Sequence, residues 1–167
     1  MAAGQLAALV AGHAVLGAAL LATVEKFLPV VPSSALLVCF GMTMVTGPGD
    51  LATLLLATTT GSTVGCLCLY AAGRMLGEGH CAALVSRYGR YVHISDTRYR
   101  RWVTHYRRHE FRMTLLGQTI PAARACLPLP AGIFRMAIGR FVLAVVMGAT
   151  IWNGSFLTIG FILRPSG

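Results

Sequence analysis

Among the ionisable side chains within or beside apolar stretches of this chain, five are the candidates for chemistry in a membrane. They are Glu25, Arg74, Arg124, Arg135 and Arg140. An ionised group at membrane depth costs roughly 2.5 to 3.5 kcal/mol on insertion scales, so each is a hypothesis for function. We expect Arg74 and Arg140 to extend to the cytoplasmic interface, which leaves Glu25 and Arg124 harder to explain by packing.

Glu25 and Arg124 each lie a few residues from a proline-interrupted segment. Pro29 and Pro32 follow Glu25, and Pro121 precedes Arg124. An arginine fork beside exposed backbone amides suits an anionic group such as a phosphate. A carboxylate at the same depth could take up and release protons, which would couple them to the movement of that anion. The pattern therefore predicts a phosphate site, with proton coupling as a further hypothesis.

The composition indicates which solvent surrounds these residues. Of 167 residues, 56% are hydrophobic and 11% are charged, and the mean hydropathy is +0.69. A water-soluble domain could not cover so much apolar surface. Four stretches approach the length that crosses about 30 Å of hydrocarbon. They are residues 5–24, 26–46, 51–73 and 137–163, with 111–134 as a fifth, interrupted candidate. We expect residues 1–167 to form a single membrane domain without a removable signal peptide.

The net charge of +9 is concentrated in one segment. Eight of the 13 arginines fall between Arg87 and Arg112. This predicts an amphipathic basic loop, at about residues 78–110, on the cytoplasmic side of the membrane. We expect no nucleic-acid binding, because no recognition module accompanies the charge.

Proline determines how the chain threads the membrane. A straight helix through either proline-containing segment would leave backbone groups unpaired in lipid. We therefore expect two re-entrant helical hairpins, at about 25–48 and 111–134, that enter from opposite faces. With about three to four spanning helices, this is an all-α integral membrane protein with an inverted-repeat, transporter-like fold. Two proline-kinked spanning helices are the alternative.

Smaller signals concern packing and metal binding. Gly61 with Gly65, and Gly73 with Gly77, form GxxxG patterns that predict close helix approach. The five cysteines show no CxxC or Cys/His spacing, so we predict no disulfide, metal or cofactor.

Four stretches, in order, resemble the DedA family of integral membrane proteins, whose shared region is called the VTT domain. They are "VEKFLPVVPSSALL", "GSTVGCLCLYAAGRMLGEG", "GQTIPAARACLPLPAGIFRM" and "RFVLAVVMGATIWN". The matching positions are Glu25, Phe27, Pro29, Pro32, Gly41, Gly61, Gly65, Tyr70, Gly73, Arg74, Pro121, Arg124, Pro130, Ala131, Gly132, Met136, Gly148 and Trp152. The resemblance covers about residues 24–153.

Two positions depart from the family pattern. Ser34 replaces the second acidic residue, and Gln118 replaces the first arginine of an Arg-x-x-Pro-x-x-Arg motif. The two lost charges are opposite, so they could have formed an ion pair, and their absence puts proton coupling in doubt.

The resemblance implies a lipid transporter of the inner, cytoplasmic membrane, with undecaprenyl phosphate as the cargo of bacterial members. Its partners would be this lipid phosphate, membrane lipids, protons and, as a homo-oligomer, further copies of the chain. The residues leave other functions open. A proton-coupled transporter of another small anion or drug is one alternative. A membrane phosphatase is less favoured, because no His and downstream Asp complete the terminal "RPSG", so we expect no enzyme.

Residue patterns and resemblance together give one set of candidate substrate-binding and transport residues. The set is Glu25, Pro29, Pro32, Ser34, Arg74, Gln118, Pro121, Arg124 and Arg135.

Overall fold

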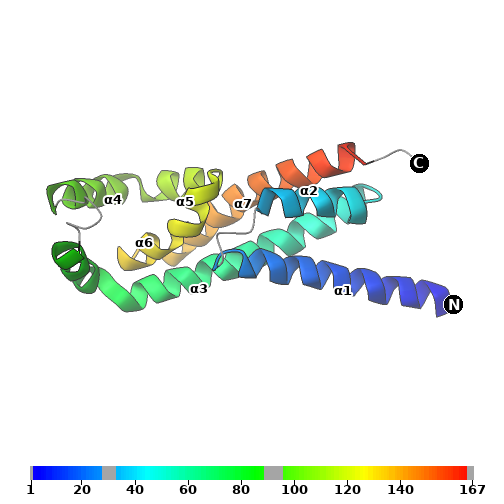
Figure 1. Ribbon diagram of the computed structural model, residues 1–167, viewed down its shortest axis with the longest axis horizontal. Helices are drawn as coiled ribbons and strands as arrows, with labels where there is room; N and C mark the ends of the chain where they lie inside the picture. The colour runs from blue at the N-terminus through cyan, green and yellow to red at the C-terminus, as the bar shows by residue number, and fades with distance from the viewer. Residues whose placement is uncertain (1, 28–32, 89–95, 165–167) are drawn as a thin grey trace. The chain divides into compact units, whose positions relative to one another are not determined.

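The computed structural model describes residues 2–27, 33–88 and 96–164. Side chains are described for all of these residues except 2–12, 80–88, 96–100 and 122. This part of the chain is helical and contains no strand, which confirms the all-α prediction (Figure 1). The helices are α1 (Ala2–Val24), α2 (Ser33–Met44), α3 (Pro48–Tyr88), α4 (Asp96–Gln118), α5 (Pro121–Cys126), α6 (Pro128–Ile133) and α7 (Ile138–Ile162).

Three prolines begin helices instead of interrupting them. Pro48, Pro121 and Pro128 are the first residues of α3, α5 and α6. Proline suits this position because its fixed φ is helical and its missing N–H would have no partner in the first turn. The predicted break in residues 111–134 therefore takes the form of three successive helices, α4, α5 and α6. Pro29 and Pro32 lie outside the described residues.

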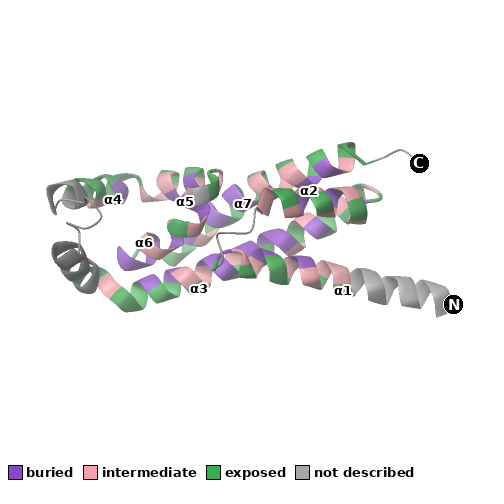
Figure 2. Cartoon of the chain, in the orientation of Figure 1, coloured by how far each residue is buried: buried purple, intermediate pink, exposed green. Residues whose placement is uncertain are grey.

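Two described helices are long and apolar enough to cross a membrane by length and composition. These spans are Pro48–Gly79 and Ile138–Ile162, and shorter apolar helices cover His13–Val24 and Ser33–Met44. Both spans carry exposed residues beside buried ones (Figure 2), and many of the exposed residues are apolar. Examples are Leu56, Val64 and Met75 on α3 and Leu143, Ile151 and Ile159 on α7. Such surfaces are unfavourable in water and stable against lipid.

The helices form two compact units. The first consists of Met1–Cys66 and Val146–Gly167, and the second of Leu67–Val145. Helix α3 passes from the first unit into the second, and α7 passes from the second into the first. Each unit therefore contains part of each long span.

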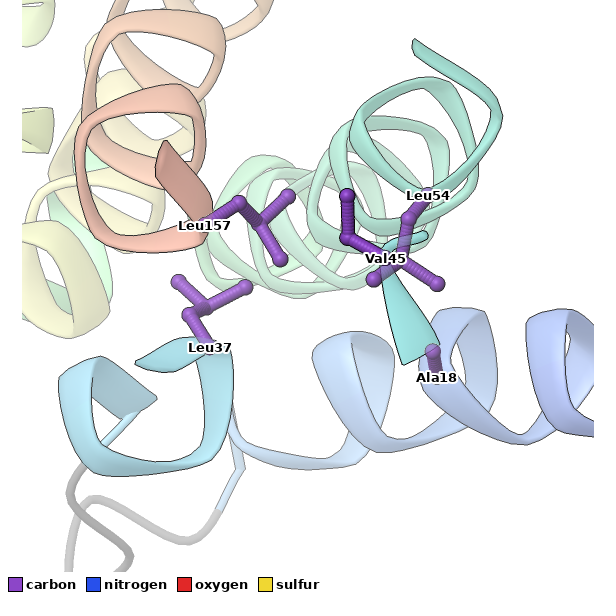
Figure 3. Close-up of a cluster of buried hydrophobic side chains, with 5 residues drawn as sticks. All are labelled: Ala18, Leu37, Val45, Leu54 and Leu157. Carbon is purple, nitrogen blue, oxygen red and sulfur yellow. The ribbon is translucent and has the colours of Figure 1, made fainter. Parts of the chain in front are cut away.

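In the first unit, a buried apolar cluster joins α1, α2, α3 and α7 with the turn after α2. Its members are Ala18, Leu37, Val45, Leu54 and Leu157 (Figure 3).

Glycines bring the backbones of this unit into contact. A Cβ added at Gly41 would overlap the carbonyl oxygen of Leu157, and one added at Gly160 would overlap that of Val38. Helices α2 and α7 are therefore packed backbone to backbone. Gly61 likewise lies against the carbonyl of Ala19 in α1.

In the second unit, α6 packs equally closely on α3. A Cβ at Gly73 would overlap the Leu129 carbonyl oxygen, and a Cβ at Gly132 would overlap that of Tyr70. The predicted close approach at Gly73 is therefore confirmed. At Gly77 the prediction is wrong, because no atom would lie within 4 Å of a Cβ there and its φ of 69° instead bends α3.

The basic segment is more helical than predicted. Residues of the expected loop at 78–110 belong to the end of α3, which reaches Tyr88, and to α4, which begins at Asp96. Along α4, Tyr106, Thr114 and Gln118 are buried, and the arginines at 101, 107, 108 and 112 are exposed. This spacing makes α4 amphipathic, as expected for an interfacial helix.

Candidate functional site

The break between α4 and α5 carries two of the predicted site residues. Gln118 is the last residue of α4 and is fully buried, and Arg124, on α5, is only 3% exposed. Two residues, 119 and 120, separate the helices, and α5 packs against α4. Pro121 begins α5 and is exposed. The break therefore encloses a guanidinium and a carboxamide that lie only six positions apart in the sequence.

Three backbone amides at this break are hydrogen-bonded within the chain. The N–H groups of Thr119, Ile120 and Arg124 donate to the carbonyls of Leu116, Gly117 and Ile120, at 3.1, 3.3 and 3.0 Å. Turn-type bonds therefore satisfy the chain where the regular α-helix stops. These three amides are therefore used within the chain.

A second set of polar contacts surrounds Arg74. Its Nη1 donates to the Oη of Tyr70 at 2.9 Å, and that Oη donates to the carbonyl oxygen of Met136 at 2.6 Å. Arg74 is exposed, and this bond holds its side chain against the protein. Tyr70 is 2% exposed and was not among the predicted site residues. The available signal was its position four residues before Arg74, on the same face of a helix.

Two buried aromatic side chains, Tyr106 of α4 and Phe134 after α6, pack together in the second unit. The Oη of Tyr106 lies 3.1 Å from the Oγ1 of Thr114, and its ring packs against Phe134. Burial raises the pKa of Tyr106 to about 12, so its phenol is protonated at neutral pH.

In the first unit, Glu25 forms an ion pair with its neighbour. The Nζ of Lys26 lies 3.0 Å from Glu25 Oε1, and the two side chains are 1% and 10% exposed, respectively. The stem of Lys26 passes over Gly65, where a Cβ would lie 2.8 Å from its Cγ. Lys26 was not predicted as a site residue, although its adjacency to Glu25 was visible. Ser34, half-buried, lies in the first turn of α2.

The remaining arginines lie at the surface of the second unit. Arg135 is exposed in the turn after α6, and Arg140 is exposed with its Nη1 3.5 Å from Glu110 Oε1. Of the predicted set, the structure gathers Gln118, Pro121 and Arg124 around one break and places Arg74 and Arg135 elsewhere in this unit.

A family model for the VTT domain matches residues 31–162, most of the chain. The chain belongs to the VTT-domain family. The matched range includes the α4–α5 break and both long spans, and the predicted relation to the DedA family is confirmed.

Curated relatives of this VTT domain carry two kinds of name. It is 27% identical over 147 residues to "Undecaprenyl phosphate transporter A" of Staphylococcus aureus, covering 88% of this chain and 72% of that protein. It is also 27% identical over 148 residues to an "Alkaline phosphatase-like protein" of Lactococcus lactis subsp. cremoris, covering 86% of this chain and 68% of that protein. The protein of the same name in Lactococcus lactis subsp. lactis matches equally. No solved structure matches the chain significantly.

Proposed function

We propose that this protein transports a lipid phosphate of the polyprenyl type, undecaprenyl phosphate, across the cytoplasmic membrane. The observation that carries the proposal is the burial of Arg124 beside a helix break, in a VTT domain similar to a protein named as an undecaprenyl phosphate transporter. Burying an arginine in a membrane domain is costly, and such residues usually mark the path of a substrate or ion.

Arg124 is the side chain we assign to the phosphate. A guanidinium can donate two parallel hydrogen bonds to phosphate oxygens, and the strength of these bonds rises as water is excluded. Gln118, in place of the family's other arginine, can add a neutral donor without a second positive charge. The cargo would therefore depend on Arg124 for its charge neutralisation at this break.

The packing of the short helices supports the inverted repeat that we propose. Helix α2 follows the Pro29–Pro32 segment and leads into α3, and α6 follows the α4–α5 break and leads into α7. Within the first unit α2 packs closely on α7, and within the second α6 packs closely on α3. Each short helix thus packs on the long span that follows the other short helix: α2 packs on α7, and α6 packs on α3. Such an exchange fits two related halves, each with one re-entrant hairpin.

Proton coupling is the finer part of the proposal, and it rests on Glu25. The carboxylate is largely buried beside Lys26, so a change in its protonation would alter a buried ion pair. Ser34 and Gln118 leave fewer charged groups than the family pattern has, so Glu25 would carry the coupling without a second acid.

Binding of purified protein to a polyprenyl phosphate tests the assignment of the cargo. We expect Arg124→Ala to weaken binding strongly and Arg124→Lys to weaken it appreciably, because a point charge cannot hold two oxygens in a planar fork. Arg140→Ala is the matched control, since Arg140 is exposed and distant in sequence from the break. Equal losses in Arg124→Ala and Arg140→Ala would show that diffuse surface charge holds the lipid.

Two relatives are named alkaline phosphatase-like, so the binding experiment also needs a test for phosphatase activity. In the described residues, no three or more His, Cys, Asp or Glu side chains are grouped to hold a metal ion. Release of inorganic phosphate from the polyprenyl phosphate should be measured in the same samples. If the protein releases inorganic phosphate and Arg124→Ala abolishes this release, the protein is a phosphatase and the transport proposal is wrong.

A further inference from the structure

A pocket of about 630 Å³ lies in the second unit, where α3 bends at Gly77. Residues 76–79 of α3, Arg107 and Glu110 of α4, and residues 133–135 at the end of α6 line it. The volume is in the range of pockets that hold small ligands. None of these residues belongs to the α4–α5 break that carries Arg124.

Arg135 occupies an unusual backbone position at this pocket. Its φ is 54°, the left-handed region that glycine adopts most readily. The N–H of Arg135 donates to the Gly132 carbonyl and that of Met136 to the Ala131 carbonyl, both at 3.0 Å. These two bonds make the Schellman motif that ends a helix, in which the left-handed residue is usually glycine. A strained arginine where glycine fits better calls for a function of its side chain.

The charges around the pocket leave Arg135 uncompensated. Glu78 is ion-paired with Arg107, and Glu110 with Arg140. In the part of the chain that the structure describes, the Arg135 side chain forms no ion pair or hydrogen bond. The four charged residues of the lining balance one another, and Arg140, which pairs with Glu110 from outside the lining, brings the net charge of the whole group to +1.

The position of the pocket along the spans indicates the source of an anion. Residues 76–79 are the last of the apolar span Pro48–Gly79, and Arg135 lies three residues before the span Ile138–Ile162. Both spans therefore end at the pocket. In a membrane protein, the change from apolar to charged residues at the end of a span marks the level of the lipid headgroups.

We propose that this pocket binds the phosphodiester headgroup of a membrane phospholipid, with Arg135 as the residue that holds the phosphate. A phosphodiester carries one negative charge, which matches the single uncompensated arginine. A phosphate monoester carries about 1.5 to 2 negative charges at neutral pH, and the two carboxylates on the wall disfavour that excess. This site is separate from the one proposed for the transported lipid, and it does not rest on that proposal.

Arg135→Gly tests the proposal because it separates binding from folding. Glycine relieves the left-handed strain, so the variant should unfold at a temperature about 2 to 4 °C higher than the wild type. Removing the guanidinium should weaken the first phosphatidylglycerol adduct roughly tenfold, as counted by native mass spectrometry of protein in an uncharged detergent. Arg112→Ala, on the exposed face of α4 and outside the pocket, should leave that adduct unchanged.

Two further probes identify the ligand. Phosphatidic acid, a monoester, should bind more weakly than phosphatidylglycerol in the wild type, and Glu110→Gln should reduce this difference. Inorganic phosphate at millimolar concentration should not displace phosphatidylglycerol. Unchanged phosphatidylglycerol binding in Arg135→Gly, an equal loss in Arg112→Ala, or displacement by inorganic phosphate would overturn the assignment.

Discussion

Tyr70 and Met136 are 66 positions apart in the sequence, and the Tyr70 hydroxyl donates to the Met136 carbonyl oxygen at 2.6 Å. This bond ties the middle of α3 to the turn between α6 and α7. The same hydroxyl accepts a hydrogen bond from Arg74, near the end of the span. The buried Tyr70 hydroxyl therefore bonds to both Met136 and Arg74. Tyr70 and Met136 are both among the positions that match the family pattern. Their hydrogen bond is a physical reason for a tyrosine at position 70, because it uses the tyrosine hydroxyl.

Tyr70→Phe should lower the free energy of unfolding by about 0.5 to 2 kcal/mol, because it leaves a buried carbonyl without its donor. Arg74→Ala should cost less, since Arg74 is exposed. Thermal unfolding in detergent of both variants and of the double variant gives the coupling between them. Additive losses would contradict the shared hydroxyl.

The glycines of α3 should respond differently to substitution. Gly73→Ala should destabilise the protein by roughly 1 to 3 kcal/mol, because its Cβ meets the backbone of α6. Gly77→Ala meets no atom but carries left-handed strain of about 1 to 2 kcal/mol. Asparagine tolerates that conformation better, so Gly77→Asn should be milder than Gly77→Ala. At Gly73, asparagine should be no milder than alanine, and the reverse order at either site would contradict this reading.

Features that depend on neighbouring residues could be predicted from the sequence, whereas contacts between residues far apart in the chain could not. Proline and hydrophobic length act locally, so the apolar spans and the break near Arg124 could be predicted. The bond from Tyr70 to Met136 joins distant segments and leaves no spacing signature. The left-handed Arg135 was hidden because sequence rules place glycine at such a position. The packing of Gly65 on the stem of Lys26 is likewise a tertiary contact that only the fold reveals.

Replacement of Glu25 should remove any pH dependence of transport. Glu25→Gln would leave the buried Lys26 ammonium without this carboxylate, and breaking a buried pair costs about 3 to 5 kcal/mol. Glu25→Gln/Lys26→Met should recover most of that stability, because it removes both charges. Transport by the double variant is then measured between pH 6 and 8. A pH profile like that of the wild type would rule out Glu25 as the coupling residue.

Single-cysteine labelling can test whether the two hairpins enter from opposite faces. Gly41, although central in hairpin 25–48, is unsuitable because any side chain there meets the backbone of α7. Thr43 on α2 and Arg112 on α4 are both exposed. In a variant without the native cysteines, we expect a membrane-impermeant reagent to label Thr43→Cys from outside and Arg112→Cys from the cytoplasmic side. Labelling of both from the same side would contradict the inverted arrangement.

Transport of a labelled polyprenyl phosphate in liposomes tests the central claim most directly. The accessibility of its headgroup to a quencher on one side reports translocation, and phosphate release is followed in parallel. We predict rapid equilibration across the membrane with the wild type and with Arg140→Ala, slower exchange with Arg124→Lys, and the protein-free rate with Arg124→Ala. Exchange by Arg124→Ala as fast as that of the wild type would contradict the proposal that the buried arginine carries the lipid phosphate.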